Sequence, residues 1–360
     1  MKELNMSKLK VLNDKPTSSD VYHHFTEIKN ENWKKWEETF DEKYKEYRYK
    51  FENYPKTLTV PDTPIHIDNE TSSKCHLSCV FCPRTEPVQK GLWREEEHME
   101  FSLFKKIIDE AANIGVYSIN LNFLGEPLLN PKLPDFIQYA KKKGILDVFL
   151  HTSGTPMGEK KLKAIMTSGL DKLAISFDSP YKKKYEEVRV NASYEKTLEN
   201  IKKISEYKKR TGQIKPLTRI NFIKLPGTTQ EEINDLIKLF SPLVDSIGLL
   251  DYVDPFKAKS AQIKDGHISK WVCPQILTRL MIYQNGNIHP CCSDYNNELK
   301  LGSIQENGLM GAWNSGKLKY IRQKHLEGKF YEIPACRNCE FAIQGDLKSQ
   351  IEVSMFENMV

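Results

Sequence analysis

The residues of this sequence best suited to metal binding or redox chemistry are its eight cysteines, which fall into two groups. Three of them, Cys75, Cys79 and Cys82, share one short loop with a C-x3-C-x2-C spacing. The other five lie toward the C-terminus, at Cys273, Cys291, Cys292, Cys336 and Cys339. Because the sequence starts without a signal-peptide pattern, clustered cysteines indicate metal or redox sites rather than disulfides. The grouping therefore predicts two metal centres in two domains.

The first group of cysteines could hold either of two metal centres. Three thiolates on a cubane iron–sulfur cluster would leave one iron without a protein ligand, free to bind another molecule. A tetrahedral zinc ion would instead need a fourth protein ligand, which His76 or a distant cysteine could supply. The spacing alone favours the cluster, with zinc as the alternative.

The bulk composition excludes several classes of protein. A chain of 360 residues with 39% hydrophobic content can form one large domain and a smaller one. The net charge of +5 comes from 53 basic and 48 acidic residues, with no arginine stripe that would indicate a nucleic-acid partner. No apolar run approaches the roughly 18 residues of a membrane span, so we expect a soluble cytoplasmic protein.

The first segment, residues 1–61, is highly charged and carries aromatic residues at a spacing of three and four. This spacing is typical of one face of a helix. We therefore expect an N-terminal helical extension whose aromatic face packs against the main domain. A docking surface for a peptide or protein substrate is the alternative. The aromatic residues concerned are Trp33, Trp36, Phe40, Tyr44, Tyr47 and Phe51.

Residues 62–255 alternate between strand and helix patterns, which predicts an α/β fold with parallel strands and right-handed crossovers. We expect a partial (β/α)6 barrel, whose chemistry would lie at the C-terminal ends of the strands. The predicted strands are 64–70, 117–124, 147–151, 172–178, 219–224 and 246–252. The predicted helices are 101–115, 132–143, 159–168, 193–211 and 230–240.

The cysteine loop, with the aromatic Phe81 just before its third cysteine, resembles the cluster loop of the radical S-adenosylmethionine (SAM) enzymes. In that family SAM chelates the open iron of a 4Fe–4S cluster and is split into methionine and a 5′-deoxyadenosyl radical. The radical takes hydrogen from the substrate, while the protein supplies binding and orientation. The resemblance covers about residues 62–255 and implies Cys75, Cys79 and Cys82 as cluster ligands.

The resemblance also implies SAM-binding residues after the second and third strands. Gly125 and Glu126 match the end of a Gly-Gly-Glu motif that binds the SAM amino group, with Leu124 in place of the first glycine. Ser153 stands where relatives often have an asparagine, at the end of the third strand. An ordinary turn is the alternative for the Gly-Glu-Pro segment, and its position after the second strand favours the binding role.

Further SAM contacts are implied at the fourth strand and beyond. Ser176 and Asp178 match a Ser-x-Asp motif that contacts the ribose or methionyl part. Arg189 resembles an arginine that pairs with the methionyl carboxylate, and a surface arginine is the alternative. The backbone of Phe81 is expected near the adenine.

The second cysteine group, within residues 256–360, resembles the SPASM extension of radical SAM enzymes, which binds one or two auxiliary 4Fe–4S clusters. The chain has too few cysteines for two, so the resemblance implies one cluster, with a zinc site as the alternative. Cys292 is then left over as a buried thiol, an alternative ligand or a hydrogen-atom donor. The implied ligands are Cys273, Cys291, Cys336 and Cys339.

Taken together, the resemblance implies a radical SAM oxidoreductase or epimerase with two 4Fe–4S clusters and an electron donor such as flavodoxin or ferredoxin. Because no peptide-recognition module is evident, we expect a carbohydrate-type or other small substrate, with peptide or protein modification as the alternative. An oxidation would also need a proton acceptor, for which Asp254 and Asp294 are candidates, although each could be an ordinary loop residue. The alternative from a different class of protein is an electron-transfer or metal-binding module that catalyses no reaction of its own.

Overall fold

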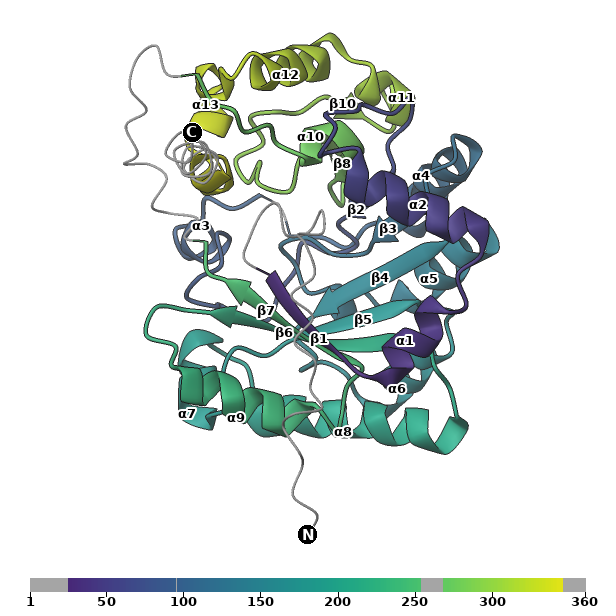
Figure 1. Ribbon diagram of the computed structural model, residues 1–360, viewed down its shortest axis with the longest axis vertical. Coiled ribbons are helices and arrows are strands. Elements are labelled where there is room, and N and C mark those ends of the chain that lie inside the picture. The colour runs from purple at the N-terminus through teal and green to yellow at the C-terminus, as the bar shows by residue number, and fades with distance from the viewer. Residues whose placement is uncertain (1–24, 95, 254–267, 346–360) are drawn as a thin grey trace, which may run out of the picture.

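The structure, a computed structural model, describes residues 25–94, 96–253 and 268–345. Ten strands of these residues form one sheet in the order β1-β7-β6-β5-β4-β3-β2-β8-β9-β10 (Figure 1). Strands β2 to β7 pair in parallel, in chain order. They are β2 (His66–Asn69), β3 (Ser118–Asn120), β4 (Asp147–Thr152), β5 (Lys172–Ser176), β6 (Leu217–Lys224) and β7 (Ser246–Asp251).

Helices lie between these strands in the chain and cover the outer face of the sheet (Figure 1). Each predicted helix has its counterpart, and the predicted α/β partial barrel is confirmed. The main helices are α4 (Phe101–Asn113), α5 (Leu133–Lys142), α6 (Glu159–Met166), α8 (Tyr194–Thr211) and α9 (Gln230–Phe240). Two short helices were not predicted, α3 (Thr85–Gln89) and α7 (Lys182–Val188).

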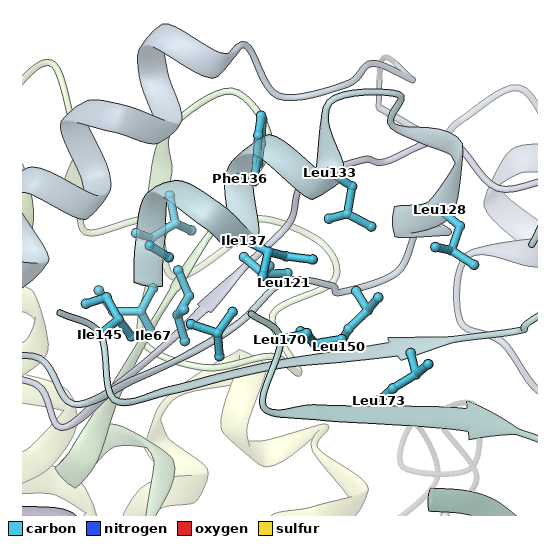
Figure 2. Packing of buried hydrophobic residues seen from close by; sticks show 14 of the residues in the cluster. Ile67, Leu121, Leu128, Leu133, Phe136, Ile137, Ile145, Leu150, Leu170 and Leu173 are labelled. Carbon is cyan, nitrogen blue, oxygen red and sulfur yellow. The ribbon is translucent and has the colours of Figure 1, made fainter. Parts of the chain in front are cut away.

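The core lies between the parallel strands and these helices (Figure 2). Each helix contributes apolar residues at a spacing of three and four, so that one face is buried and the opposite face is exposed to solvent. In α5, for example, Leu133, Phe136, Ile137 and Ala140 are buried. The strands are buried on both faces near their centres, as expected for a parallel sheet.

Strands from outside the barrel segment extend the sheet at both edges. At one edge β1 (Phe25–Lys29) pairs antiparallel with β7, although the sequence predicted only helices in the N-terminal extension. At the other edge β8 (Arg279–Ile282) pairs in parallel with β2 and leads into β9 (Asn287–His289) and β10 (Gly302–Ser303). The cysteine-rich C-terminal segment therefore continues the same sheet.

The N-terminal helices α1 (Glu31–Glu37) and α2 (Glu42–Asn53) bury their aromatic faces, which confirms the predicted packing. Their buried side chains cluster with Ile65 and Leu217, at the N-terminal ends of the barrel strands. The buried aromatic residues of this cluster are Trp33, Trp36, Tyr44 and Tyr47.

The C-terminal segment forms short helices around the second cysteine group: α10 (Gln275–Thr278), α11 (Gly308–Trp313), α12 (Gly316–Leu326) and α13 (Pro334–Arg337). Trp313 anchors this segment, because it is 1% exposed and its indole N–H donates to the carbonyl of Pro61 at 3.1 Å. Within the described ranges, no helix combines the length and the apolar character needed to cross a bilayer.

Candidate functional site

The loop with the first three cysteines follows β2, at the C-terminal end of the parallel strands. Backbone hydrogen bonds join it to the C-terminal end of α7 and the residues just after it, from Ser78 N to the Val190 carbonyl and from Val80 N to the Val188 carbonyl, both at 3.0 Å. The hydroxyl of Thr85 donates to the Cys79 carbonyl at 2.8 Å. Hydrogen bonds from and to the backbone therefore hold the loop in place.

The three thiols lie in surroundings that disfavour a bare thiolate. The pKa of Cys75 is raised to about 12 and that of Cys79 to about 11, mainly by burial and to a smaller extent by nearby charges such as Glu126 and the neighbouring thiols. A cationic metal centre would offset this cost, and an all-cysteine donor set suits an iron–sulfur cluster. In the described parts of the chain, no three Cys, His, Asp or Glu side chains converge tightly enough to hold a single metal ion. His76, the alternative zinc ligand, has two buried ring nitrogens without hydrogen-bond partners.

Gly125 lies where the chain after β3 passes close to the cysteine loop. A Cβ atom at this position would lie 1.9 Å from the carbonyl oxygen of Ser72, so only glycine fits. The next residue is tied to the same loop, because the backbone N–H of Glu126 donates to the Lys74 carbonyl at 2.8 Å. The Gly-Glu-Pro segment is thus packed directly against the chain that leads to Cys75.

The Glu126 carboxylate is buried and links the turn after β3 to the end of β4. It accepts hydrogen bonds from the Thr152 hydroxyl at 2.6 Å, the Ser153 N–H at 2.8 Å and the Ser153 hydroxyl at 2.7 Å. The backbone N–H of Leu128 adds a fourth, at 3.0 Å. Glu126 and Ser153 are therefore brought together, and their contact with SAM stays a prediction. Thr152, which the sequence analysis did not single out, directly precedes Ser153 in the sequence.

Asp178 and Arg189 lie on the other side of the cysteine loop and pair with each other. The Nε and one terminal nitrogen of Arg189 both lie 2.6 Å from Oδ2 of Asp178. Arg189 is only 6% exposed, so the alternative of a surface arginine is wrong. Ser176 ends β5 and is partly buried. Phe81 lies beneath the Arg189 guanidinium, with 5.4 Å between its ring centroid and the guanidinium carbon.

Four of the five C-terminal cysteines line one cavity, together with Trp271 and His325. Burial raises the pKa of these thiols, to about 12 for Cys273 and well above the ordinary value for Cys291 and Cys336. The charge of neighbouring thiols contributes to this rise, as at Cys291. This donor set again fits an iron–sulfur cluster. The four lining cysteines are the predicted ligands Cys273, Cys291, Cys336 and Cys339.

Cys292 is absent from the described lining of that cavity. Its thiol lies against Gln275, whose amide nitrogen is 3.1 Å and whose amide oxygen is 3.3 Å from the sulfur. The same amide oxygen accepts the backbone N–H of Cys292 at 3.2 Å. The amide of Gln275 thus fixes the orientation of the Cys292 thiol.

Of the two candidate proton acceptors, only Asp294 lies among the described residues. Asp254 lies outside the described residues. Asp294 is 3% exposed, and its carboxylate accepts hydrogen bonds from the backbone of Glu298 at 2.9 Å and of Leu299 at 2.8 Å. The ring nitrogen Nδ1 of His289 lies 2.6 Å from it. These contacts fix the loop after Cys292 and favour a structural role for Asp294.

A cavity of about 370 Å³ lies between the two groups of cysteines. Phe81 and Cys82 line it from the barrel, and Cys339 lines it from the C-terminal segment. Its acidic lining residues are Asp251, Asp294, Glu298 and Glu340, and no Lys, Arg or His side chain from the described ranges lines it. Its other aromatic lining residues are Tyr252, Tyr295 and Phe341.

A family profile described as the radical SAM superfamily matches residues 69–240, and one described as the SPASM iron–sulfur cluster-binding domain matches residues 273–340. Among curated proteins, the S-adenosyl-L-methionine-dependent 2-deoxy-scyllo-inosamine dehydrogenase of Niallia circulans is 22% identical over 278 residues, which covers 76% of this chain and 91% of the relative. The PqqA peptide cyclase of Gluconobacter oxydans is 28% identical over 120 residues, covering 33% of this chain and 32% of the relative. The structure of anSMEcpe with bound AdoMet superposes with a TM-score of 0.58 at 14% identity, covering 82% of this chain and 100% of that one.

Proposed function

The chain belongs to the radical SAM superfamily and carries a C-terminal SPASM domain, and from this we propose that it dehydrogenates a small substrate held between its two cysteine groups. Its cofactors are SAM, the radical SAM 4Fe–4S cluster and an auxiliary cluster. When bound, the reduced cluster and SAM supply a 5′-deoxyadenosyl radical that abstracts a hydrogen atom.

The observation that carries the proposal is the cavity shared by Cys82 and Cys339. Substrate chemistry requires a space that both centres can reach, and an electron carrier would need no such space. Cys75, Cys79 and Cys82 would hold the first cluster. Glu126, backed by Thr152 and Ser153, would receive the ammonium group of SAM in a charge-assisted hydrogen bond. Cys273, Cys291, Cys336 and Cys339 would hold the auxiliary cluster.

The size and charge of the cavity support a small neutral or cationic substrate. A volume of about 370 Å³ suits a small molecule or one side chain of a peptide. Carboxylates at Glu298 and Glu340 line it beside aromatic rings, which favours hydroxyl and ammonium groups over phosphates. The name of the Niallia circulans relative, an inosamine dehydrogenase, agrees with this preference.

The position of Cys292 favours dehydrogenation over epimerisation. Epimerisation needs a hydrogen-atom donor at the substrate. Dehydrogenation instead removes one further electron and one proton after the hydrogen atom. The auxiliary cluster would accept the electron, and a carboxylate that lines the cavity would accept the proton. The Cys292 thiol is engaged with Gln275 and is absent from the described lining of the cavity. We therefore propose an alcohol or amine dehydrogenation, with an electron donor such as flavodoxin or ferredoxin supplying the initiating electron.

Peptide or protein modification is the second candidate, favoured by the similarity to the PqqA peptide cyclase. Most aromatic residues of α1 and α2 are buried against Ile65 and Leu217, which argues against the exposed docking surface that the sequence analysis gave as an alternative. A peptide would therefore have to enter the cavity between the cysteine groups directly.

The proposal is tested by 5′-deoxyadenosine formation with anaerobically reconstituted, reduced protein and SAM. The matched control replaces Cys75, Cys79 and Cys82 together by alanine. Formation by the native chain alone supports the radical enzyme. The substrate is then sought by comparing aminated and neutral cyclitols with short peptides for substrate-dependent acceleration. Native protein that holds both clusters and yet forms no 5′-deoxyadenosine with any of these compounds contradicts the proposal.

A further inference from the structure

The buried pair of Asp178 and Arg189 has a third member, the sulfur of Cys79. Asp178 is 1% exposed and Arg189 is 6% exposed, so both charges lie in an environment of low polarity. The terminal nitrogen Nη1 of Arg189 points at Cys79 Sγ, with 3.9 Å between the two atoms. A guanidinium has five N–H donors, so pairing with one carboxylate leaves donors for the sulfur.

Two sets of contacts fix the direction of the Arg189 guanidinium. The Asp178 carboxylate engages its Nε and Nη2, and is itself held because Oδ1 accepts the backbone N–H of Ile223 at 3.0 Å. The residues on either side of Arg189, Val188 and Val190, carry the carbonyls to which the cysteine loop donates. The arginine and the cysteine therefore belong to one rigid unit.

We propose that Arg189, oriented by Asp178, is a positioning residue for the first cluster that raises its reduction potential through Cys79. The inference depends on Cys79 being a cluster ligand, which is part of the proposed function. Reduction adds a negative charge to a cluster, and a cation fixed close to one of its sulfurs stabilises that charge strongly where water is excluded. Hydrogen bonds to cluster sulfurs and nearby net charge are among the factors that set such potentials.

The sequence resemblance assigned Arg189 to the methionyl carboxylate of SAM, so the decisive measurement is made without SAM. The holoenzyme is titrated with a reductant and the reduced clusters are followed by electron paramagnetic resonance. A second titration with SAM identifies the first cluster, because only the signal of the SAM-binding cluster changes. The measured quantity is the SAM-free midpoint potential of that cluster.

Two variants test the charge and its geometry separately. Arg189→Gln removes the cation. In this variant we expect reduction of the first cluster to become about tenfold less favourable, which is a negative shift of about 59 mV in its midpoint potential for one electron. Arg189→Lys keeps the charge but lacks the forked donors, so we expect a smaller shift in the same direction. The signal shape of the first cluster should also change in both variants, which loss of a purely structural contact elsewhere would not produce.

The matched control is Lys208→Met, which also removes a buried cation. Lys208 pairs with Asp245 at the start of β6 and β7, the opposite end of the barrel from the cysteine loop. Its SAM-free potential should equal that of the native protein. An unchanged midpoint potential in Arg189→Gln with native iron content overturns the inference. If Arg189→Gln holds no cluster, an unchanged midpoint potential in Arg189→Lys overturns it instead. Native protein without any cluster would instead contradict the proposed function.

Discussion

Glu126 and Ser153 are joined twice, since the carboxylate accepts both the backbone N–H and the hydroxyl of Ser153, at 2.8 and 2.7 Å. This arrangement fixes the carboxylate in a buried position close to the chain that leads to Cys75. We predict that Glu126→Gln weakens SAM binding by about tenfold or more, because the ammonium group loses its charged partner. Equilibrium dialysis of the reconstituted protein measures this. Native affinity with native iron content would contradict the role of Glu126.

Ser153→Ala provides a graded comparison with the Glu126 substitution. The variant removes the hydroxyl contact but keeps the backbone N–H, so Glu126 remains in place with one fewer hydrogen bond. We expect SAM affinity to fall by about threefold, less than in Glu126→Gln. Dialysis of both variants side by side decides the order, and a larger effect for Ser153→Ala would show that the hydroxyl itself contacts SAM.

Gly125→Ala tests the close approach of two chain segments beside the site. The added methyl group would lie 1.9 Å from the Ser72 carbonyl oxygen, so the backbone must shift. We predict a loss of about 2 kcal/mol in the free energy of unfolding, together with weaker SAM binding. Chemical denaturation measures the stability. Gly316→Ala is the control, because a Cβ there meets nothing within 4 Å and Gly316 is the first residue of α12, so it should lower neither quantity.

The elements that the sequence predicted share a strong local signal. Helix α4 buries Phe104, Ile107, Ile108 and Ala111, whose spacing of three and four is visible without any structure. Turn positions after the helices carry glycines in the left-handed region, such as Gly115 and Gly144, which mark where each helix ends. The barrel and the position of the cysteine loop follow from these local signals together with the rule that parallel strands need crossovers.

The features that the sequence missed depend on partners far away in the chain. Strand β1 is an edge strand defined by its pairing with β7, with Ile28 opposite Ile247, and its five residues carry little signal of their own. The pairing of Arg189 with Asp178 and Cys79 likewise depends on where three side chains point. The orientation of Cys292 toward Gln275 could not be read from adjacent cysteines, because neighbouring residues on a loop can face opposite ways.

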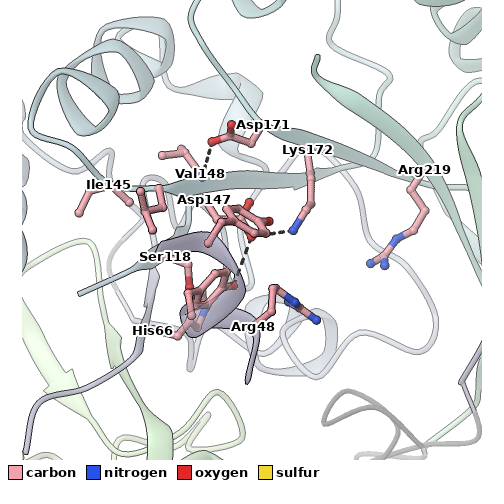
Figure 3. Close-up of polar contacts among 12 residues, drawn as sticks. Arg48, His66, Ser118, Ile145, Asp147, Val148, Asp171, Lys172 and Arg219 are labelled. Carbon is pink, nitrogen blue, oxygen red and sulfur yellow. Dashed lines mark hydrogen bonds and ion pairs between the residues drawn. The ribbon is translucent and has the colours of Figure 1, made fainter. Parts of the chain in front are cut away.

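Asp147 joins the N-terminal helices to the barrel and offers a test of stability (Figure 3). Its carboxylate accepts from the hydroxyls of Tyr44 and Tyr47, both at 3.2 Å, and from Lys172 at 2.6 Å. Asp147→Ala leaves a mostly buried ammonium group without its partner, so we predict a loss of about 3 kcal/mol in the free energy of unfolding. Asp109→Ala, which removes the exposed partner of Lys143, is the control and should change stability little.

His151 makes the stability depend on pH. Burial, followed by the charge of Arg219, lowers the pKa of its imidazole from 6.5 to about 3. Below pH 6.5 the unfolded chain gains a proton at this position and the folded chain does not. The contribution of His151 to the free energy of unfolding is therefore fully present above pH 6.5 and is lost progressively as the pH falls toward 3. We expect His151 to account for about 1 kcal/mol of the loss between pH 7 and 5, a value reduced because the ring is only partly buried. Denaturation of native protein and His151→Asn at both pH values measures the difference. An equal loss in both proteins would exclude His151 as its source.

The charge of the substrate can be tested at the cavity between the cysteine groups. Glu298 and Glu340 line it, and among the described residues their carboxylates accept hydrogen bonds from the side-chain amides of Asn296 at 3.2 Å and Gln344 at 3.0 Å. A phosphorylated substrate would meet these negative charges, whereas an ammonium group would be attracted. We predict that aminated cyclitols accelerate 5′-deoxyadenosine formation more than neutral or phosphorylated analogues at equal concentration. In Glu298→Gln/Glu340→Gln, the preference for the amine over the neutral analogue should fall by about tenfold, with SAM affinity unchanged as the control. A phosphorylated analogue that outperforms the amine in native protein would refute the assignment of substrate charge.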